Sequence, residues 1–594
     1  THPIWTTVNA KSIQDTHRVF GGATLSYAIN DNLNLAYRYG LDTYSEANTE
    51  YTNKGGKMGS AVNRTGTLNT WNNVKTITDH NISLSGDYDV TGNIGLTFVV
   101  GATSNSQVFD QNGVASTGQQ VFNVLRHFNF ENQDEIQYYQ KRNVSGVYGQ
   151  AELDYDRFVY LTLAARTDWV SNLSEENRSI TYPSASVSFL PTKVFEGLKS
   201  NLVNMLKVRV GLGASADFPF GYPIASRLNL DTQSFIRNGA AIVANTSSSQ
   251  LGNPALKPER MDELEFGIEG TFLNRRLGLD LSIYNKATKD LRIDRPLDPS
   301  TGYTTTVTNI GKIENKGAEV DLSFIWVQAQ QPGALEWTSN LNWSTNEAKV
   351  VDLGADTDYI TYAGGSGYYN VAAPGYSLGT IVGSAINRDA SGNYKVLSNG
   401  FYDIKYGTDP TENTIGDATP NFLLNFGNRI TYKNFALNFL ISHVNGGDIM
   451  SMTTSVLLGR GLVEDTVDRE QSFILPGVNP SGQPNTTQIV NSDFYFYNVL
   501  YGPGENRIYD GSVIRLQEVS LTYNLPKSIL DSTPFGSLSL SASGFNLWYD
   551  AYNTPDSVNF DPNVAGVGIG NGRGFDWLNG PSSKRYGLSL KATF

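Results

Sequence analysis

The end of the chain, Tyr586-Gly-Leu-Ser-Leu-Lys-Ala-Thr-Phe594, alternates apolar and polar residues and stops on an aromatic residue. Successive side chains of a β-strand point to opposite faces, so the apolar residues of this segment share one face. They are Tyr586, Leu588, Leu590, Ala592 and Phe594. This pattern is typical of the last strand of a transmembrane β-barrel, where one face meets lipid and the other meets water.

The composition indicates one acidic protein without internal divisions. The 594 residues contain no Pro-rich linker or charge block that would mark a domain boundary. The formal net charge of -13 repels phosphate, which excludes nucleic acid as a partner. The chain contains no cysteine, so it has no disulfide framework, thiolate metal site or cysteine nucleophile.

The hydropathy of the chain excludes transmembrane helices but fits membrane-spanning strands. Mean hydropathy is -0.30, and no apolar run approaches the roughly twenty residues that a spanning helix needs. Strands of a barrel place only alternate residues in lipid, so they need no such run. The aromatic share of 11% suits the aromatic girdles of a barrel.

Pairs of alternating segments joined by tight turns predict β-hairpins. Within residues 263–284, alternate residues are apolar on both sides of the turn Asn274-Arg275-Arg276. A second pair, residues 424–441, reverses at Lys433-Asn434. The apolar residues have even numbers before this two-residue turn and odd numbers after it, which keeps them on one face of the hairpin.

Alternating segments of this kind, about seventeen in all, predict an all-β chain that forms a transmembrane antiparallel β-barrel. They are residues 19–27, 33–39, 82–90, 94–100, 149–155, 159–165, 185–189, 206–213, 263–272, 277–284, 318–326, 335–345, 424–432, 435–441, 514–525, 538–547 and 586–594.

The connections alternate between short turns and long polar stretches. Outer-membrane barrels have tight periplasmic turns and long extracellular loops, so we expect the long stretches outside the cell. They run near residues 42–76, 104–142, 216–261, 288–316, 351–419, 448–510 and 550–583.

The number of strands predicts where the two ends of the chain lie. We expect Phe594, as the C-terminal barrel-assembly signal, at the periplasmic end of the last strand. With about seventeen strands in total, the first strand also descends, which puts Thr1 on the extracellular side. The residues that follow Thr1 lack the basic and apolar segments of a signal peptide. We therefore expect this chain to be the C-terminal portion of a longer protein.

Several segments carry a resemblance to a known family. They are Leu251-Gly-Asn-Pro-Ala-Leu-Lys-Pro-Glu-Arg260, Tyr284-Asn-Lys-Ala-Thr-Lys-Asp-Leu291, Thr308-Asn-Ile-Gly-Lys-Ile-Glu-Asn-Lys-Gly-Ala-Glu319, Leu516-Gln-Glu-Val-Ser-Leu-Thr-Tyr-Asn-Leu-Pro526, Gly544-Phe-Asn-Leu-Trp548 and Phe560-Asp-Pro562. In their order and spacing, the sequence resembles the SusC/RagA-like branch of the TonB-dependent transporters of Bacteroidetes outer membranes.

The resemblance implies a larger assembly than this chain. Members of the family form a barrel of about 22 strands around an N-terminal plug that binds TonB, and a SusD-like surface lipoprotein caps the barrel. The plug, the TonB box and about five strands are missing from this sequence. An open barrel edge would leave backbone groups unpaired in lipid, so we expect an N-terminal plug and strand fragment to complete the barrel.

The resemblance also implies a function, which is import of oligosaccharides or oligopeptides across the outer membrane. Two alternatives stay open. One is a SusC-like barrel that serves as a structural component of a larger outer-membrane assembly or secretion complex. The other is a passive porin, which needs a closed barrel without a plug.

The family-like motifs also have structural explanations. Asn253-Pro254 and Lys257-Pro258 are turn residues that lead into a strand. We expect Gly311 and Gly317 to be bend or bulge glycines at the barrel rim rather than ligand contacts.

No pattern predicts catalysis, and we expect neither enzymatic activity nor a cofactor. The histidines, His2, His17, His80, His127 and His443, are scattered without metal-ligand spacing. We expect His443, which lies in an alternating segment, to face the lumen rather than bind a metal.

Two acidic segments deserve comparison with cation sites. Asp389-Ala-Ser-Gly-Asn393 resembles a calcium loop only superficially, and a hairpin turn explains it. Asp352, Asp356 and Asp358 can gather a hard cation, but acids of a solvated loop are the simpler interpretation, so we expect no metal.

Two clusters of aromatic residues in the predicted extracellular loops are candidates for substrate binding. They are Tyr359, Tyr362, Tyr368 and Tyr369, and Phe494, Tyr495, Phe496 and Tyr497. Loop aromatics offer a large contact area at low entropy cost, so they can stack on sugar rings or peptide side chains, or pack against a lid protein. Packing at the rim of the barrel explains them equally well.

Overall fold

The computed structural model describes residues 3–56, 64–237, 240–354, 357–555, 557–558, 560–563, 570 and 572–594. The chain divides into two compact units. Unit 1 is Thr1–Val187, Gly213–Arg260 and Asp290–Asn309, and unit 2 is Ser188–Leu212, Met261–Lys289 and Ile310–Phe594. No helix in the described part of the chain is long and apolar enough to cross a membrane.

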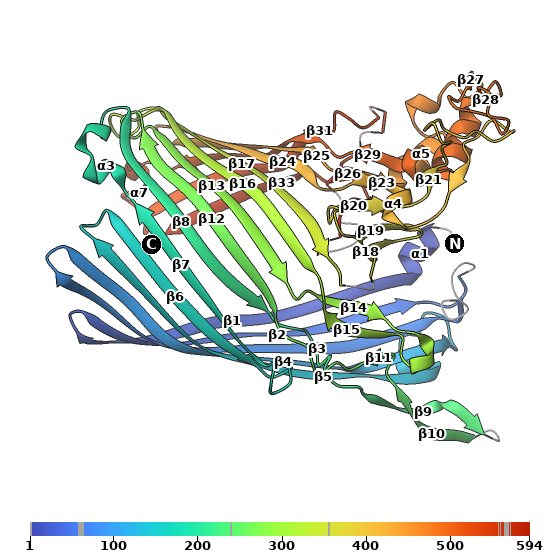
Figure 1. Cartoon of the computed structure of the whole chain (residues 1–594), viewed down its shortest axis with the longest axis horizontal. Coiled ribbons are helices and arrows are strands. Elements are labelled where there is room, and N and C mark those ends of the chain that lie inside the picture. Colours follow the sequence, from blue (N-terminus) through green and yellow to red (C-terminus); the bar gives the residue numbers. More distant parts are fainter. Residues whose placement is uncertain are drawn as a thin grey trace. The chain divides into compact units, whose positions relative to one another are not determined.

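Unit 1 is built on consecutive strands, each antiparallel to the next (Figure 1). They are β1 (Ala10–Asn30), β2 (Leu33–Thr52), β3 (Thr67–Thr91), β4 (Ile94–Gln119), β5 (Phe130–Tyr155), β6 (Val159–Val170) and β7 (Ser179–Phe189). Near their turns these strands expose apolar side chains on one face, including Leu25 and Ile82, which are 71% and 49% exposed. Such an uncovered apolar face is what lipid requires.

Strands β1 to β5 are much longer than a membrane requires. Strand β4 has 26 residues, whereas β6 has 12. At about 3.3 Å per residue β4 measures about 85 Å, which at a tilt of about 45° still exceeds an apolar band about 25 Å tall. Figure 1 shows β1 to β5 as the long blue-to-cyan strands.

The predicted loops 42–76 and 104–142 are therefore largely wrong. Strand β2 continues to Thr52 and β3 begins at Thr67, while β4 continues to Gln119 and β5 begins at Phe130. Beyond the membrane both faces of a strand meet water, so the alternation that marks a strand disappears although the backbone ladder continues. The sequence there is polar on both faces and was indistinguishable from a loop.

Unit 1 also contains shorter elements and a small apolar core. They are α1 (Pro3–Asn9), η1 (His127–Asn129), β9 (Leu228–Arg237), β10 (Ala240–Ser247), β11 (Gln250–Leu251), β14 (Arg292–Pro296), η3 (Pro299–Thr301) and β15 (Thr305–Asn309). The core consists of the buried residues Val170, Leu173, Phe218 and Leu256. Strand β15 pairs with both β11 and β14 beside this core.

The first and third family-like motifs meet in unit 1. The backbone N–H of Lys257 donates to Oδ1 of Asn309 at 2.7 Å, and Nδ2 of Asn309 donates to the carbonyl of Lys257 at 3.0 Å. Nδ2 of Asn253 donates to the carbonyl of Val307 at 2.8 Å. Oδ1 of Asn253 also accepts from the N–H of Ala255, which forms a turn. The motif residues thus shape the chain, as the sequence predicted.

Unit 2 contains the other long antiparallel strands, and most of them pair with their neighbours along the chain. They are β8 (Val203–Asp217), β12 (Glu259–Phe272), β13 (Leu277–Lys289), β16 (Lys312–Val327), β17 (Glu336–Asp352), β24 (Pro420–Tyr432), β25 (Phe435–Gly446), β30 (Val513–Asn524), β31 (Ser537–Asp550) and β33 (Arg585–Thr593). Three short helices, α3 (Pro191–Val194), η2 (Glu196–Leu198) and α7 (Lys527–Leu530), lie in the connections. Every predicted strand segment falls on a long strand of one of the two units.

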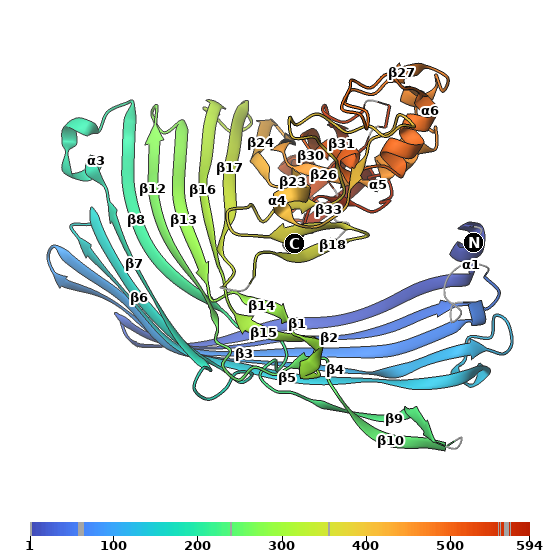
Figure 2. The same cartoon turned by 45° about the vertical axis from the view of Figure 1, so that its right-hand side comes forward.

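The long loops of unit 2 are folded structures of their own. They contain β18 (Ile360–Gly365), β19 (Tyr368–Ala372), β20 (Thr380–Val382), β21 (Ala385–Ile386), β22 (Ile404–Lys405), α4 (Pro410–Asn413), β23 (Thr414–Asp417), β26 (Asp448–Ser451), α5 (Met452–Gly459), η4 (Glu464–Thr466), β27 (Ser472–Ile474), β28 (Gln488–Val490), α6 (Asn491–Asp493), the π-helix η5 (Phe494–Leu500), η6 (Gly504–Arg507), β29 (Ile508–Asp510) and β32 (Phe575–Asp576). Figure 2 shows α5, α6 and β27 gathered in one part of this unit.

Two apolar cores hold these loops together. One contains Ile381, Met450 and Phe575, and the other contains Ile386, Val396, Tyr402, Leu475 and Ile489. Segments that are far apart in the sequence share each core, so these loops are fixed by packing rather than by local turns alone.

Gly317 has a different role from the predicted bend or bulge. It lies within β16, directly opposite Tyr284 in an uninterrupted register with β13. A Cβ at this position would overlap the Tyr284 phenol. Glycine is needed here because the neighbouring ring occupies the space of its side chain. Gly311, by contrast, has a φ of 99°, a conformation that favours glycine.

Candidate functional site

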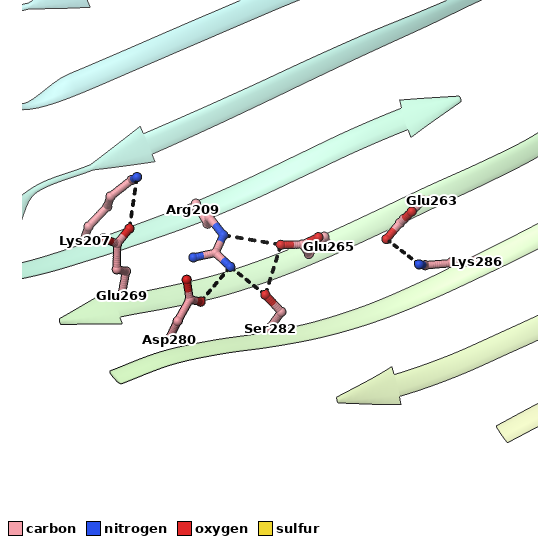
Figure 3. Close-up of polar contacts among 8 residues, drawn as sticks. All are labelled: Lys207, Arg209, Glu263, Glu265, Glu269, Asp280, Ser282 and Lys286. Carbon is pink, nitrogen blue, oxygen red and sulfur yellow. Dashed lines mark hydrogen bonds and ion pairs between the residues drawn. The ribbon is translucent and has the colours of Figure 1, made fainter. Parts of the chain in front are cut away.

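The strands of unit 2 have one apolar and one charged face. On β12 and β13, Leu264, Phe266 and Ile283 are 49%, 40% and 51% exposed. The alternate residues of the same strands form a network of ion pairs, drawn in Figure 3. Uncovered apolar side chains on one face and ions on the other are what separation of lipid from a water-filled interior requires.

Arg209 of β8 is the centre of the charged face (Figure 3). Its Nε lies 3.3 Å from Oε1 of Glu265, and its Nη2 lies 2.8 Å from Oδ1 of Asp280. Nη2 also donates to Oγ of Ser282 at 2.6 Å. Gly267 leaves the space that the guanidinium fills, since a Cβ there would overlap Arg209. One arginine thus ties three neighbouring strands together.

A cavity of about 560 Å³, lined by both polar and apolar residues, lies at the ends of β24, β25 and β30. Its lining includes Asn425, Ser442, Asp448, Gln517 and Arg573. The guanidinium of Arg573 has no hydrogen-bond or ion-pair partner in the described part of the chain, so it is available to a solute. A cavity with an available cation and several amide and hydroxyl groups suits a polar, hydrogen-bonding ligand.

The lining of this cavity includes the acid Asp448. Burial raises the pKa of its carboxyl, and the neighbouring Asp510 and Asp417 add to this effect. The N–H of Asp417 donates to Oδ2 of Asp448 at 2.8 Å and opposes it. The result is a pKa above the ordinary value for aspartate.

A buried ion pair anchors the last long loop, near residues 550–583, to strand β30. Arg515 of β30 and Asp561 are 7% and 9% exposed, and Nη2 and Nη1 of Arg515 lie 2.6 Å and 3.0 Å from the two carboxylate oxygens of Asp561. Burial alone would raise the pKa of Asp561, but the hydrogen bonds from Arg515 and from the N–H of Asn563 outweigh it and lower the pKa. No sequence pattern predicts this pair, although Asp561 lies in one of the family-like segments.

Comparison with known proteins decides the family. Residues 2–442 match the model of the family described as TonB dependent receptor-like, beta-barrel. The chain belongs to this family. The resemblance seen in the sequence is thereby confirmed, and the protein is an outer-membrane β-barrel of a family of receptors rather than enzymes.

The TonB-dependent receptors that resemble this chain are longer. TonB-dependent receptor P3 of Formosa agariphila is 26% identical over 79% of this chain and 46% of its own length. TonB-dependent receptor P26 of the same organism is 26% identical over 91% of this chain and 54% of its own length. TonB-dependent receptor SusC of Bacteroides thetaiotaomicron is 27% identical over 35% of this chain and 21% of its own length. The chain thus spans about half the length of the first two relatives.

A solved structure shares the fold. The structure of the RagAB peptide transporter superimposes with a TM-score of 0.75 and 17% identity, covering 100% of this chain and 63% of the other. The predicted fold class, an all-β transmembrane barrel of this type, is confirmed.

The first aromatic cluster of this receptor is divided between core and surface. Tyr368 is buried against Trp577, with the guanidinium of Arg507 5.4 Å from its ring, so it stabilises the loops. Tyr362 is 37% exposed, and its hydroxyl donates to the carbonyl of Leu378. Burial raises the pKa of Tyr362 to about 12.

The other two tyrosines of this cluster are partly exposed. The hydroxyl of Tyr359 lies 3.4 Å from that of Thr408. Tyr369 lies opposite Gly364 in the hairpin of β18 and β19. Substrate contact by Tyr359, Tyr362 and Tyr369 stays a prediction.

The second cluster is brought together on the π-helix η5. Phe494 faces the second core and meets Phe473 edge-on at 5.5 Å. Phe496 meets Tyr497 at 4.9 Å, and the guanidinium of Arg460 lies 5.6 Å from the Phe496 ring. π-helical turns are frequent at functional sites, and their distortion here places aromatic rings at the surface.

A smaller cavity of about 240 Å³ adjoins this π-helix. Its lining includes Arg460, Arg469, Tyr495, Phe496 and Tyr497. Arginines beside aromatic rings can hold the polar groups and the apolar faces of one ligand together. A role of Tyr495, Phe496 and Tyr497 in substrate binding stays a prediction.

His443 is one of the residues that line the larger cavity, and its predicted lumenal position stays a prediction. It lies opposite Leu424 and Ile514, on the face that also carries Ile441. Its Nε2 lies 3.0 Å from the hydroxyl of Tyr552.

The acidic segments form turns. Asp352 accepts from the N–H of Gly354 at 3.0 Å, while Asp356 lies outside the described residues. Oδ1 of Asp389 accepts from the N–H groups of Ser391 and Asn393 at 2.8 and 2.9 Å, which closes a tight turn. In the described part of the chain, no group of three or more histidine or acidic side chains can hold a metal ion.

Proposed function

We propose that the longer protein to which this chain belongs imports large polar nutrients, oligosaccharides or oligopeptides, across the outer membrane. In this proposal the chain supplies barrel wall and substrate-facing loops. A plug outside this chain couples transport to TonB, and a SusD-like surface lipoprotein covers the mouth. Membership of the TonB-dependent receptor family and the likeness to the RagAB peptide transporter support it.

The larger cavity, at the ends of β24, β25 and β30, is the observation that carries the proposal. It is too large for a single ion, and it offers an available guanidinium at Arg573 together with the amides of Asn425 and Gln517. These groups bind hydroxyl, carboxylate and amide groups, which are the groups that sugars and peptides share. The folded loops above it, held by two cores, can present a fixed surface to a covering protein.

The test is uptake by cells that carry the full-length receptor. Fluorescent oligosaccharides and oligopeptides are supplied to cells with the receptor, without it, and with the receptor but without TonB. We expect accumulation of one of the two classes that needs both proteins, and co-purification of a lipoprotein with the receptor.

Two variants connect this test to the cavity. Arg573→Ala removes the available cation, and we expect it to lower uptake severalfold. Lys527→Ala removes an exposed cation from the turn beyond β30 and serves as the control. Unchanged uptake in cells without the receptor, together with loss of other outer-membrane proteins, would favour the structural role over transport.

A further inference from the structure

The parts of β1 to β5 farthest from their turns form a two-sided polar sheet, which we call the wall. It comprises residues 10–18, 42–52, 67–79, 104–119 and 130–143. Within β2 to β4 the register is unbroken over these residues, and each strand is paired on both sides. The wall therefore offers a ligand its side chains rather than free backbone groups.

One row of the wall crosses four strands. Glu46 lies opposite Asn73, Asn73 lies opposite Gln111, and Gln111 lies opposite Tyr138. Side chains directly opposite one another share a face, so these residues form one row, which we call the rung.

Hydrogen bonds fix the polar members of the rung. Nδ2 of Asn73 donates to Oε1 of Glu46 at 2.8 Å, and Nε2 of Gln111 donates to Oδ1 of Asn73 at 2.8 Å. Asn48 also donates to Oε1 of Glu46 at 2.8 Å. The bonds from Asn48 and Asn73 lower the pKa of Glu46, which keeps it ionised. Each amide still has unused donors or acceptors.

Aromatic rings flank the rung on the same face. Trp71 is two residues from Asn73, and Phe109 is two residues from Gln111. Gly113 lies opposite Trp71, and a Cβ there would collide with the carbonyl oxygen of Thr70 and with Cα and Cβ of Trp71, so glycine permits this close approach of the two strands. The rings of Phe109 and Tyr138 are 6.0 Å apart, and Tyr138 is 43% exposed.

The opposite face of the wall carries a different row at the same height. Its corresponding row is Ala47, Asn72, Asn112 and Gln137, which contains no carboxylate and no aromatic ring. Two residues along the strands, Asp110 lies opposite Tyr139 on this face, so the rung is set apart by its hydrogen-bonded carboxylate and amides beside the Trp71 indole.

This chemistry favours a sugar over a peptide. Planar amides and a carboxylate match the paired hydroxyls of a pyranose, while aromatic rings pack on its apolar face. A peptide that binds by strand addition needs a free strand edge, and β2 to β4 have none over the rung. Lys75, two residues from Asn73, balances the charge of Glu46, so an anionic sugar gains no net attraction.

We propose that the rung and its flanking rings bind a neutral oligosaccharide, and that this surface is separate from the cavity of unit 2. The proposal rests on the proposed import function and narrows its substrate class. The wall would hold the glycan outside the membrane before transport.

The test uses the purified full-length receptor and a panel of neutral oligosaccharides derived from glucans, mannans, xylans and galactans, with uncharged peptides of similar size. Trp71→Ala and Gln111→Ala remove a ring and a polar member of the rung. Trp71→Phe keeps an aromatic ring, and the double variant Asn72→Ala/Asn112→Ala alters the opposite face at the same height. Heat-modifiable electrophoretic mobility shows that each variant is folded.

We expect at least one oligosaccharide to bind, with affinity lowered about tenfold by Trp71→Ala and by Gln111→Ala. Trp71→Phe and the opposite-face variant should retain most of it. Binding of peptides alone, or no binding of any oligosaccharide in the panel, overturns the proposal. An affinity in both alanine variants equal to that of the unaltered receptor overturns it as well.

Cellular uptake separates this proposal from the proposed function. If TonB-dependent uptake persists and the alanine variants at Trp71 and Gln111 do not alter it, the rung is wrong and import stands. If neither oligosaccharides nor oligopeptides are taken up, import is wrong, and the binding measurement still decides on the rung.

Discussion

Asn309 and Lys257 exchange two hydrogen bonds, one in each direction, at 2.7 and 3.0 Å. The amide of Asn309 thus replaces a strand partner for a segment that has left the ladder. Nδ2 of Asn309 also donates to the carbonyl of Asp290 at 2.8 Å. Asn309 thus connects its own family-like motif to two others, through Lys257 and Asp290.

Asn309→Ala should loosen this junction without unfolding the chain. Because water reaches these groups, we expect a cost of about 1–2 kcal/mol, seen as roughly tenfold faster hydrogen exchange of the Lys257 amide. Asn309→Asp keeps the acceptor and should show a smaller effect. Unchanged exchange in Asn309→Ala would show that the contact contributes nothing.

Asp561→Asn should detach the last long loop. The variant leaves Arg515 buried without its counter-charge, which costs about 3–5 kcal/mol in buried pairs. We expect rapid proteolysis within residues 550–583, measured on the receptor in detergent. Resistance equal to that of the unaltered chain would contradict this account of the anchor.

The ion pair of Arg515 and Asp561 also predicts how the stability of this loop depends on pH. Asp561 has a lowered pKa in the folded state, so its contribution to stability is complete above the ordinary aspartate value near 3.8. The contribution is lost only as the pH falls through the lowered pKa. Cleavage of this loop by an acid-active protease should therefore stay slow at pH values just below 3.8 and become fast on further acidification.

Asp448 predicts the opposite dependence. Its pKa is raised, so the folded state holds a proton that the unfolded state has lost, and stability falls as the pH rises from about 3.8 through the raised pKa. Asp448→Asn keeps an oxygen to accept from the N–H of Asp417 but cannot ionise. We expect it to raise the thermal midpoint near neutral pH and to have little effect in acid. A lower midpoint at neutral pH would contradict the prediction.

Arg209→Ala should weaken the junction of β8, β12 and β13. Glu265 and Asp280 would then face each other without the arginine between them, at a cost of about 1–3 kcal/mol. Arg209→Lys keeps the charge but lacks the forked guanidinium that reaches both carboxylates. Its thermal midpoint should therefore lie between those of the alanine variant and the unaltered chain. The expected order fails if both variants melt alike.

The alternation of apolar and polar residues predicts the membrane-spanning strands because lipid requires apolar side chains on one face of each strand. Wherever one face is apolar, as at Leu264, Phe266 and Ile268, period two can be read from the sequence alone. Where the wall extends beyond the membrane, water meets both of its faces. The strand residues of 42–52 and 104–119 therefore have the sequence pattern of loops. Their strand structure is set by pairing with neighbours, which no local pattern records.

The site was less predictable because it depends on contacts between distant residues. Tyr368 and Tyr497 look alike in the sequence, yet one packs in a core and the other is 50% exposed. The pairing of Arg515 with Asp561 and the row from Glu46 to Tyr138 join residues that only the strand register brings together. Sequence reasoning found the aromatic clusters but could not assign each ring to core or surface.

Alternating contact with lipid is the central claim, and the absence of cysteine from the chain makes it directly measurable. Single cysteines are placed in turn at residues 263–268 of the full-length receptor, labelled with a fluorophore, and exposed to a quencher confined to the lipid phase. We predict quenching at the positions of Leu264, Phe266 and Ile268 and none at the positions between them. Quenching that does not alternate, or none at any position, would contradict the barrel-wall account.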